Sequence, residues 1–307
     1  MAFSAKDVAR LREMTGVGMM DCKKALVESD GDFDKAVEFL REKGLAAATK
    51  KAGRIAAEGI VDAAVCAQCG ASIIEVNSET DFVGKNEGFR SFVADLNTII
   101  LKNKPADVDA LLNLKYLDTD LTVAGMLQEK ILTIGENIKI RRFERVDAEA
   151  GIVNVAYIHM GGKIGVLVTL KVSEGLEENA TVAELGKDIA MQIAAMNPQW
   201  LNKEDVPAET VEKEKAILLA QTIEEGKPEK VAEKIVMGRI GKFYSENCLI
   251  EQAFVKENKI SVKQHVAAVA KELGGSIDVV KYVRFEKGEG LAKREDNFAD
   301  EVASMVK

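Results

Sequence analysis

A unit of two short apolar strands, a turn and an amphipathic helix occurs twice in this chain, and it constrains the fold more than any other feature. Strands of this kind joined by short turns are typical of antiparallel hairpins. The two copies begin at Gly59 and Gly151, about ninety residues apart. The first copy has strands at 59–65 and 71–76 and a helix at 86–101. The second has strands at 151–157 and 163–170 and a helix through 182–193. The repeat predicts a duplicated α+β core.

The residues before the first copy predict a small bundle of three short helices. Ser4 and Asp32 are suitable N-caps for the first and third helices, and Gly44 is the predicted end of the third. A basic, alanine-rich stretch at 46–54 then predicts a tether. The expected organisation is a bundle with its tether at 1–54, two core subdomains at 55–146 and 147–290, and a C-terminal helical module at 291–307.

The second subdomain carries a highly charged insertion at about 205–245. Its first helix is predicted from Pro207 to Glu225, and Gly226-Lys227-Pro228 separates it from a second helix that ends near Phe243. Helices joined so tightly lie antiparallel, and the polar surface of the first predicts a hairpin that projects from the body. The remaining pattern predicts a helix at 262–273, a strand at 279–285 and a final amphipathic helix through Phe298 and Val302.

Charge and hydropathy narrow the class of partner. The formal net charge is −8 and the sequence pI is near 5.2, so a general nucleic-acid surface is disfavoured and a protein partner is expected. The sequence shows no apolar run of about 18 residues and no apolar signal segment at its start, which predicts a cytoplasmic protein without membrane contact. Its four cysteines are few and scattered, which favours reduced thiols.

Catalytic motifs are scarce. The two histidines are His159 and His265, and the sequence has no glycine-rich loop ending in Gly-Lys-Ser/Thr. Cys66-Ala67-Gln68-Cys69 has the spacing of a redox or zinc motif, but a second ligand pair is missing and the motif lies between predicted strands. We interpret it as a hairpin turn, with a small redox protein as the rival reading. The sequence therefore predicts a binding protein without a cofactor or metal, rather than an enzyme.

The segment from Val76 to Val83 leads from a buried strand through polar turn formers to a bulky ring, Phe82. One interpretation buries Phe82 under the following helix with Asp81 as its cap, and the other directs Phe82 outward. This segment resembles bacterial elongation factor Ts, the guanine-nucleotide exchange factor of elongation factor Tu. The resemblance covers the whole chain and includes residues 16–26, 76–83, 130–142 and 284–286.

The resemblance implies how the chain meets its partner. It places Asp81 and Phe82 beside the magnesium site of elongation factor Tu, where they promote GDP release, and it makes the N-terminal bundle a ubiquitin-associated type of domain. GDP and magnesium then belong to the partner. The implied contact residues are Thr80, Asp81, Phe82, Val83, Ile134, Gly135, His159, Val255 and Lys23.

Two points stay open within the resemblance. Lys256 stands where an apolar residue is expected after Val255, which weakens the third contact loop. The charged insertion resembles the family's coiled-coil projection, for which self-association, as in a dimer of heterodimers, and contact with the partner are both open. A ubiquitin-type adaptor built on the N-terminal bundle is the rival class, and the long duplicated core argues against it.

Overall fold

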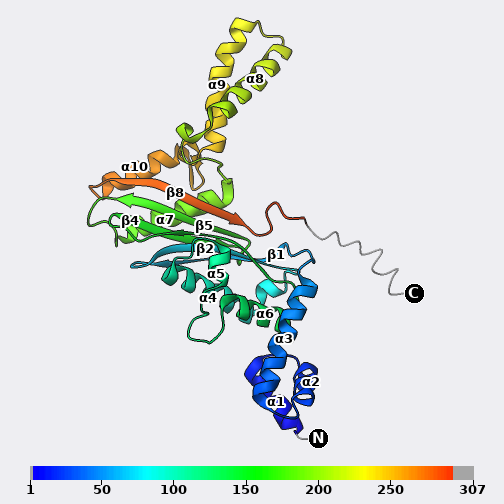
Figure 1. The fold of residues 1–307 in the computed structure, drawn as a ribbon. Helices are drawn as coiled ribbons and strands as arrows, with labels where there is room; N and C mark the ends of the chain where they lie inside the picture. The colour runs from blue at the N-terminus through cyan, green and yellow to red at the C-terminus, as the bar shows by residue number, and fades with distance from the viewer. Residues whose placement is uncertain (1–2, 293–307) are drawn as a thin grey trace.

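The structure is a computed structural model that describes residues 3–292. Two three-stranded antiparallel sheets lie against each other at the centre of the molecule, and helices cover their outer sides (Figure 1). The first sheet has the order β1-β2-β3 and the second the order β4-β5-β8. Their strands are β1 (Glu58–Cys66), β2 (Gly70–Ser78), β3 (Lys139–Val146), β4 (Ile152–His159), β5 (Ile164–Val172) and β8 (Ile277–Glu286). The prediction of an α+β fold with antiparallel hairpins is confirmed.

Each sheet has its own helical cover. Helices α4 (Glu87–Asn103), α5 (Val108–Leu112) and α6 (Val123–Ile134) pack on the first sheet. Helices α7 (Ala180–Met196) and α10 (Val262–Glu272) pack on the second. A small hairpin of β6 (Ala253–Phe254) and β7 (Glu257–Ser261) precedes α10, and 3-10 turns lie at Val83–Lys85, Lys203–Asp205 and Leu249–Glu251. The hairpin of β6 and β7 and the helices α5 and α6 were not predicted from the sequence.

Strand β2 is buried along its whole length, because both of its faces are covered. Ile74 and Val76 point into the core beneath α4, while Ala71 and Ile73 pack between the two sheets. A strand covered on both sides carries apolar residues on both faces, as Ile73 and Ile74 do here. Its buried polar side chains, among them Ser72 and Glu75, are hydrogen-bonded.

The contact between the sheets depends on a glycine. A Cβ atom at Gly165 would lie 2.4 Å from Cγ1 of Val61, which is closer than real Cβ atoms approach. The backbones also bond directly here, since the Val61 amide donates to the Gly162 carbonyl at 2.8 Å. The two sheets therefore meet with little space between their backbones at this point, which fixes the loops at their ends relative to each other.

The N-terminal bundle consists of α1 (Ala5–Thr15), α2 (Met19–Glu28) and α3 (Phe33–Lys51), with Ser4 and Asp32 as the predicted caps. The predicted end of the third helix at Gly44 is wrong, because α3 continues to Lys51 and includes most of the expected tether. Gly44 packs instead against α6, where a Cβ would lie 3.5 Å from the Gln128 carbonyl oxygen. That spacing is ordinary van der Waals contact, so Gly44 stands within a continuous helix rather than at its end.

The charged insertion forms α8 (Ala208–Glu224) and α9 (Glu229–Asn247), an antiparallel pair that projects from the sheets at the end opposite the N-terminal bundle (Figure 1). The side chain of Arg239 in α9 ties the pair together by donating hydrogen bonds to Thr222 and Glu225. The final helix predicted through Phe298 and Val302 lies outside the described residues. Among residues 3–292, none of the helices is long and apolar enough to cross a membrane.

The prediction that all four cysteines are reduced is wrong for one pair. Cys66 and Cys69 form a disulfide across the β1–β2 turn, whose Cα atoms are 5.1 Å apart. That separation lies within the range that a disulfide spans without backbone movement. Cys22 and Cys248 are free and buried.

Candidate functional site

Residues 79–82, here called the Phe82 loop, connect β2 to the 3-10 turn at Val83–Lys85. Phe82 is 76% exposed, whereas the next residue, Val83, is 5% exposed and packs in the core of the first sheet. Asn86 rather than Asp81 caps α4, accepting a hydrogen bond from the Phe89 amide at 3.0 Å. The interpretation in which Phe82 is buried and Asp81 caps the helix is therefore wrong. Val83 anchors the loop, and the Phe82 ring points outward.

Asp81 and Lys85 place charges beside the exposed ring. Nζ of Lys85 donates to the Asp81 carboxylate at 2.9 Å and lies 5.5 Å from the centre of the Phe82 ring. The hydrogen bond from Lys85 lowers the pKa of Asp81. The tip of the loop thus presents an apolar ring next to an ionised carboxylate.

A set of reciprocal hydrogen bonds, here called the clamp, fixes the base of the Phe82 loop. It consists of Glu79, Thr80, Glu136 and Asn137. Glu136 accepts from the Thr80 amide at 2.9 Å and from its hydroxyl at 2.6 Å. In return, the Asn137 amide donates to Glu79 at 2.6 Å. Hydrogen bonds to carboxylates are among the stronger ones in proteins, so the clamp holds the loop against the end of α6.

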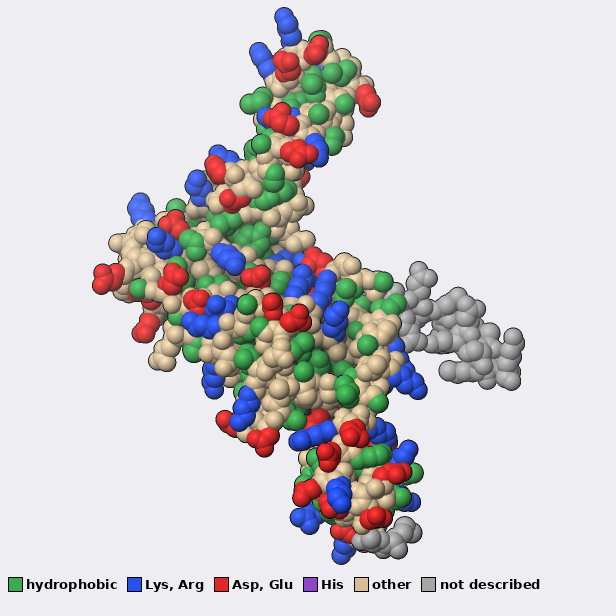
Figure 2. Space-filling model, in the orientation of Figure 1, with side chains coloured by type: hydrophobic (Ala, Val, Ile, Leu, Met, Phe, Trp, Pro, Cys, Tyr) green, Lys and Arg blue, Asp and Glu red, His purple; other side chains and the backbone are tan. Residues whose placement is uncertain are grey.

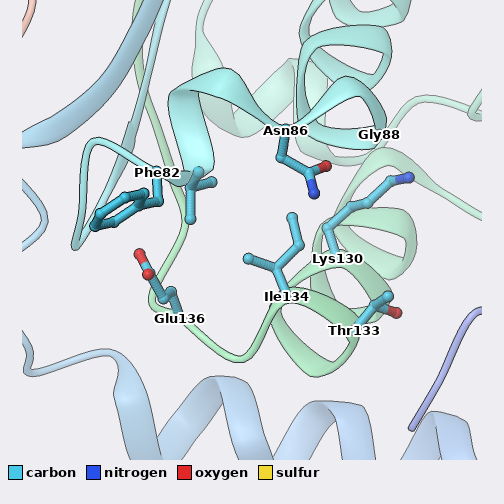
Figure 3. A pocket seen from close by; sticks show the side chains of 8 residues that line it. Phe82, Asn86, Gly88, Lys130, Thr133, Ile134 and Glu136 are labelled. Carbon is cyan, nitrogen blue, oxygen red and sulfur yellow. The ribbon is translucent and has the colours of Figure 1, made fainter.

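The end of α6 also supplies Ile134 and Gly135. Gly135 ends the helix in the left-handed conformation (φ +85°) and is exposed, and Ile134 is partly buried beside it. Phe82, Ile134 and Glu136 line one open pocket of about 400 Å³ (Figure 3). The other lining residues are Val83, Asn86, Gly88, Lys130 and Thr133. The structure thus places two of the predicted contact segments around one pocket.

Arg90 connects the 3-10 turn that follows the Phe82 loop to the turn between β4 and β5. From α4, its Nε donates to the Gly84 carbonyl at 2.9 Å, and its Nη2 donates to the Gly161 carbonyl at 2.5 Å. His159 lies at the end of β4, with Nδ1 2.9 Å from the Tyr157 hydroxyl, and Met160 next to it is 69% exposed. The turn beside His159 is therefore joined through Arg90 to the 3-10 turn that follows the Phe82 loop.

Val255 and Lys23 lie apart from this group. Val255 is half exposed in the turn between β6 and β7, where its amide donates to the Gln192 side chain at 2.8 Å. Lys256, the departure from the family pattern, pairs with Asp188 of α7 at 2.6 Å. The substitution therefore fastens the turn to α7 and leaves the Val255 side chain available. Lys23 is exposed on α2 of the N-terminal bundle.

Phe82, Met160 and Val255 are exposed apolar side chains on loops that a rigid scaffold positions, and such loops commonly carry the binding residues of a protein. Lys and Arg are interspersed with Asp and Glu over the face shown in Figure 2, which does not form a continuous basic surface. The fold and this surface define a protein-binding factor.

Comparison with known proteins identifies which factor family this is. Residues 79–289 match the family model described as Elongation factor TS. The chain is 51% identical over 307 residues to elongation factor Ts of Syntrophotalea carbinolica, covering 100% of both chains. It is 51% identical to the Clostridium perfringens protein over 98% of both chains, and 48% identical to the Clostridium kluyveri protein over 99% of this chain and 98% of that one. The chain belongs to the elongation factor Ts family, whose members act in translation elongation as partners of elongation factor Tu.

Proposed function

We propose that this chain accelerates the release of GDP from elongation factor Tu by binding the nucleotide-free form of that protein more tightly than the GDP-bound form. Linkage then requires that GDP weaken the binding of this chain by the same factor. The observation that carries the proposal is the exposed Phe82 ring on a loop whose base is held by the clamp and whose following 3-10 turn is held by Arg90. A pre-positioned apolar ring can enter a partner without first losing loop entropy.

Phe82 acts as a wedge in this mechanism. Its insertion with Asp81 shifts a segment of the partner beside the magnesium ion, disturbing the ligands that hold the cation against the diphosphate. Magnesium requires near-ideal octahedral coordination, so a small displacement of its ligands weakens its binding. Loss of the cation leaves the phosphate charge poorly compensated, and GDP dissociates. The magnesium and the nucleotide both belong to the partner, and the chain itself performs no chemical step.

Several contacts must act together. Burial of one Phe side chain contributes about 1.5–3 kcal/mol, and each tenfold change in affinity requires about 1.4 kcal/mol. Phe82 therefore supplies about one to two decades of the exchange effect. Thr80, the turn at Ile134 and Gly135, and the separate loops at His159 and Val255 supply the remainder.

The organisation of the chain supports this division of roles. We infer that residues 55–146 and 147–290 are related core subdomains that both grip the partner, since each contributes one sheet and at least one exposed loop. Lys23 and the N-terminal bundle then contact the GTPase domain of the partner. The α8–α9 hairpin is available either for self-association or for an additional contact.

The test is stopped-flow release of a fluorescent GDP analogue from elongation factor Tu at increasing concentrations of this chain. We expect an acceleration that saturates, because a complex forms before nucleotide leaves. Nucleotide release that stays at its spontaneous rate, with a folded chain and active partner, would refute the proposed function. It would then favour the adaptor reading, which a ubiquitin pull-down examines.

The clamp gives a prediction of its own. Glu136→Ala removes both hydrogen bonds to Thr80, so the Phe82 loop loses its fixed position in the free chain. Ordering the loop when the partner binds then costs free energy, and we expect about a 3- to 10-fold lower maximal rate of GDP release. Glu136→Gln keeps a carbonyl acceptor and should recover part of the rate. Glu174→Ala, which removes an exposed carboxylate near the second sheet, serves as the control. Equal maximal rates for Glu136→Ala and Glu174→Ala would show that the clamp does not position the loop.

A further inference from the structure

The disulfide between Cys66 and Cys69 lies at a surface turn that the proposed function does not use. Ala67 and Gln68 between the two cysteines are exposed, and both cysteines are partly exposed. Small thiol reagents can therefore approach the sulfur atoms. We propose that Cys66 and Cys69 form a reversible redox site that exchanges two electrons with low-molecular-weight thiols and disulfides.

The geometry of the turn favours reaction at Cys66. The Cys69 amide donates a hydrogen bond to Sγ of Cys66 at 3.1 Å, which stabilises negative charge on that sulfur. The thiolate is the reactive form in disulfide exchange. Cys66 is therefore the sulfur that attacks first during oxidation. In the reverse reaction an incoming thiolate attacks Sγ of Cys66 and releases Cys69.

The backbone around the pair is fixed independently of the sulfur atoms. Cys66 pairs with Gly70 at the end of the β1–β2 ladder. A Cβ at Gly70 would lie 1.9 Å from the Val146 carbonyl oxygen, so the turn is seated directly against the end of β3. Because the ladder and this contact hold the turn, both the dithiol and the disulfide fit the same backbone. Such a preformed turn lowers the cost of closing the disulfide.

The other cysteines differ in the properties that govern reactivity. Cys22 and Cys248 are each 0% exposed. Burial raises the pKa of Cys22, and it raises the pKa of Cys248 to about 11. Neither forms a thiolate readily, so both remain thiols under conditions that oxidise the turn. A zinc site at the turn is disfavoured, because residues 3–292 hold no cluster of three or more His, Cys, Asp or Glu side chains suited to a metal.

The exchange balances as two steps. In oxidation, the Cys66 thiolate attacks a low-molecular-weight disulfide such as glutathione disulfide, forming a mixed disulfide and releasing one glutathione thiolate. The Cys69 thiolate then attacks Sγ of Cys66, forming the protein disulfide and releasing the second glutathione. The protein loses two electrons and two protons, and the glutathione disulfide becomes two thiols. Reduction follows the same steps in reverse.

The test equilibrates the folded, full-length chain in a series of reduced and oxidised glutathione buffers. The samples are quenched in acid and unfolded, and their free thiols are labelled with a maleimide. Intact mass spectrometry then counts the labels on each chain. We expect four labels in the most reducing buffer and two in the most oxidising one, with one two-electron transition between them. Four labels in every buffer, or two labels that persist in excess dithiothreitol, would overturn the proposal.

Two variants assign the transition to the turn. Cys22→Ser combined with Cys248→Ser should keep it, with two labels changing to none. Cys66→Ser should abolish it, and any residual two-electron transition in that variant would contradict the assignment. GDP release should be equal for the oxidised and reduced wild type, because the turn and the Phe82 loop lie at opposite ends of β2. The labelling result is independent of whether the chain acts on elongation factor Tu.

Discussion

Phe82→Ala is expected to lower the acceleration of GDP release by about 10- to 100-fold. The ring is 76% exposed in the free chain, so it contributes little to the core and its loss should leave the stability of the chain within about 0.5 kcal/mol of the wild type. Its apolar surface is buried only when the partner is bound. The measurement is stopped-flow release of a fluorescent GDP analogue, together with thermal unfolding of the free variant.

The control for this prediction is Val280→Ala, which removes a half-exposed apolar side chain from β8. Both variants lose surface apolar area, but only Phe82 belongs to the proposed wedge. If the folded Phe82→Ala protein accelerated GDP release as well as Val280→Ala does, the wedge mechanism would be wrong. In that case the acceleration of GDP release would come from the other contact loops.

Much of the core could be predicted because its pattern is local. The hairpins, α4 and α7 each show their own periodicity in the sequence. Gly44 misled the prediction for α3, since a glycine that ends a helix and a glycine inside a longer helix look the same in sequence. The prediction of reduced thiols was wrong for Cys66 and Cys69, because the pairing of β1 with β2 on either side of the turn sets the distance between the two cysteines.

The outward position of Phe82 followed from the family resemblance, because apolar content alone left its burial undecided. The clamp and Arg90 were missed for a physical reason: their partners are distant in sequence. Thr80 and Glu136 are 56 residues apart, and Arg90 lies 71 residues from Gly161. Glu136 carries a weak local signal, since it follows the glycine that ends α6 at a predicted contact. A carboxylate at this position is well placed to hold a loop, but the sequence does not show that the loop is the one that carries Thr80.

The structure also shows how the two sheets are held at a fixed orientation, which any mechanism with contacts from both halves requires. Glu75 of β2 is 0% exposed, and its carboxylate joins side chains of the first sheet to the segment that follows β8. It accepts from Arg141 at 2.9 Å, from Arg142 at 2.7 Å and from the amide of Gly288, just beyond β8, at 2.8 Å. The Asn77 side chain donates to the same carboxylate at 3.0 Å.

Glu75→Ala is expected to lower the free energy of unfolding by about 3–5 kcal/mol, the usual cost of removing one partner from a buried ion pair. The variant leaves two arginines without their main counter-charge and a buried amide without an acceptor. Glu289→Ala removes the exposed second partner of Arg142 and should cost no more than about 1 kcal/mol. Urea denaturation of both variants measures the difference. A midpoint for Glu75→Ala equal to that of Glu289→Ala would mean that apolar packing, rather than this carboxylate, joins the two sheets.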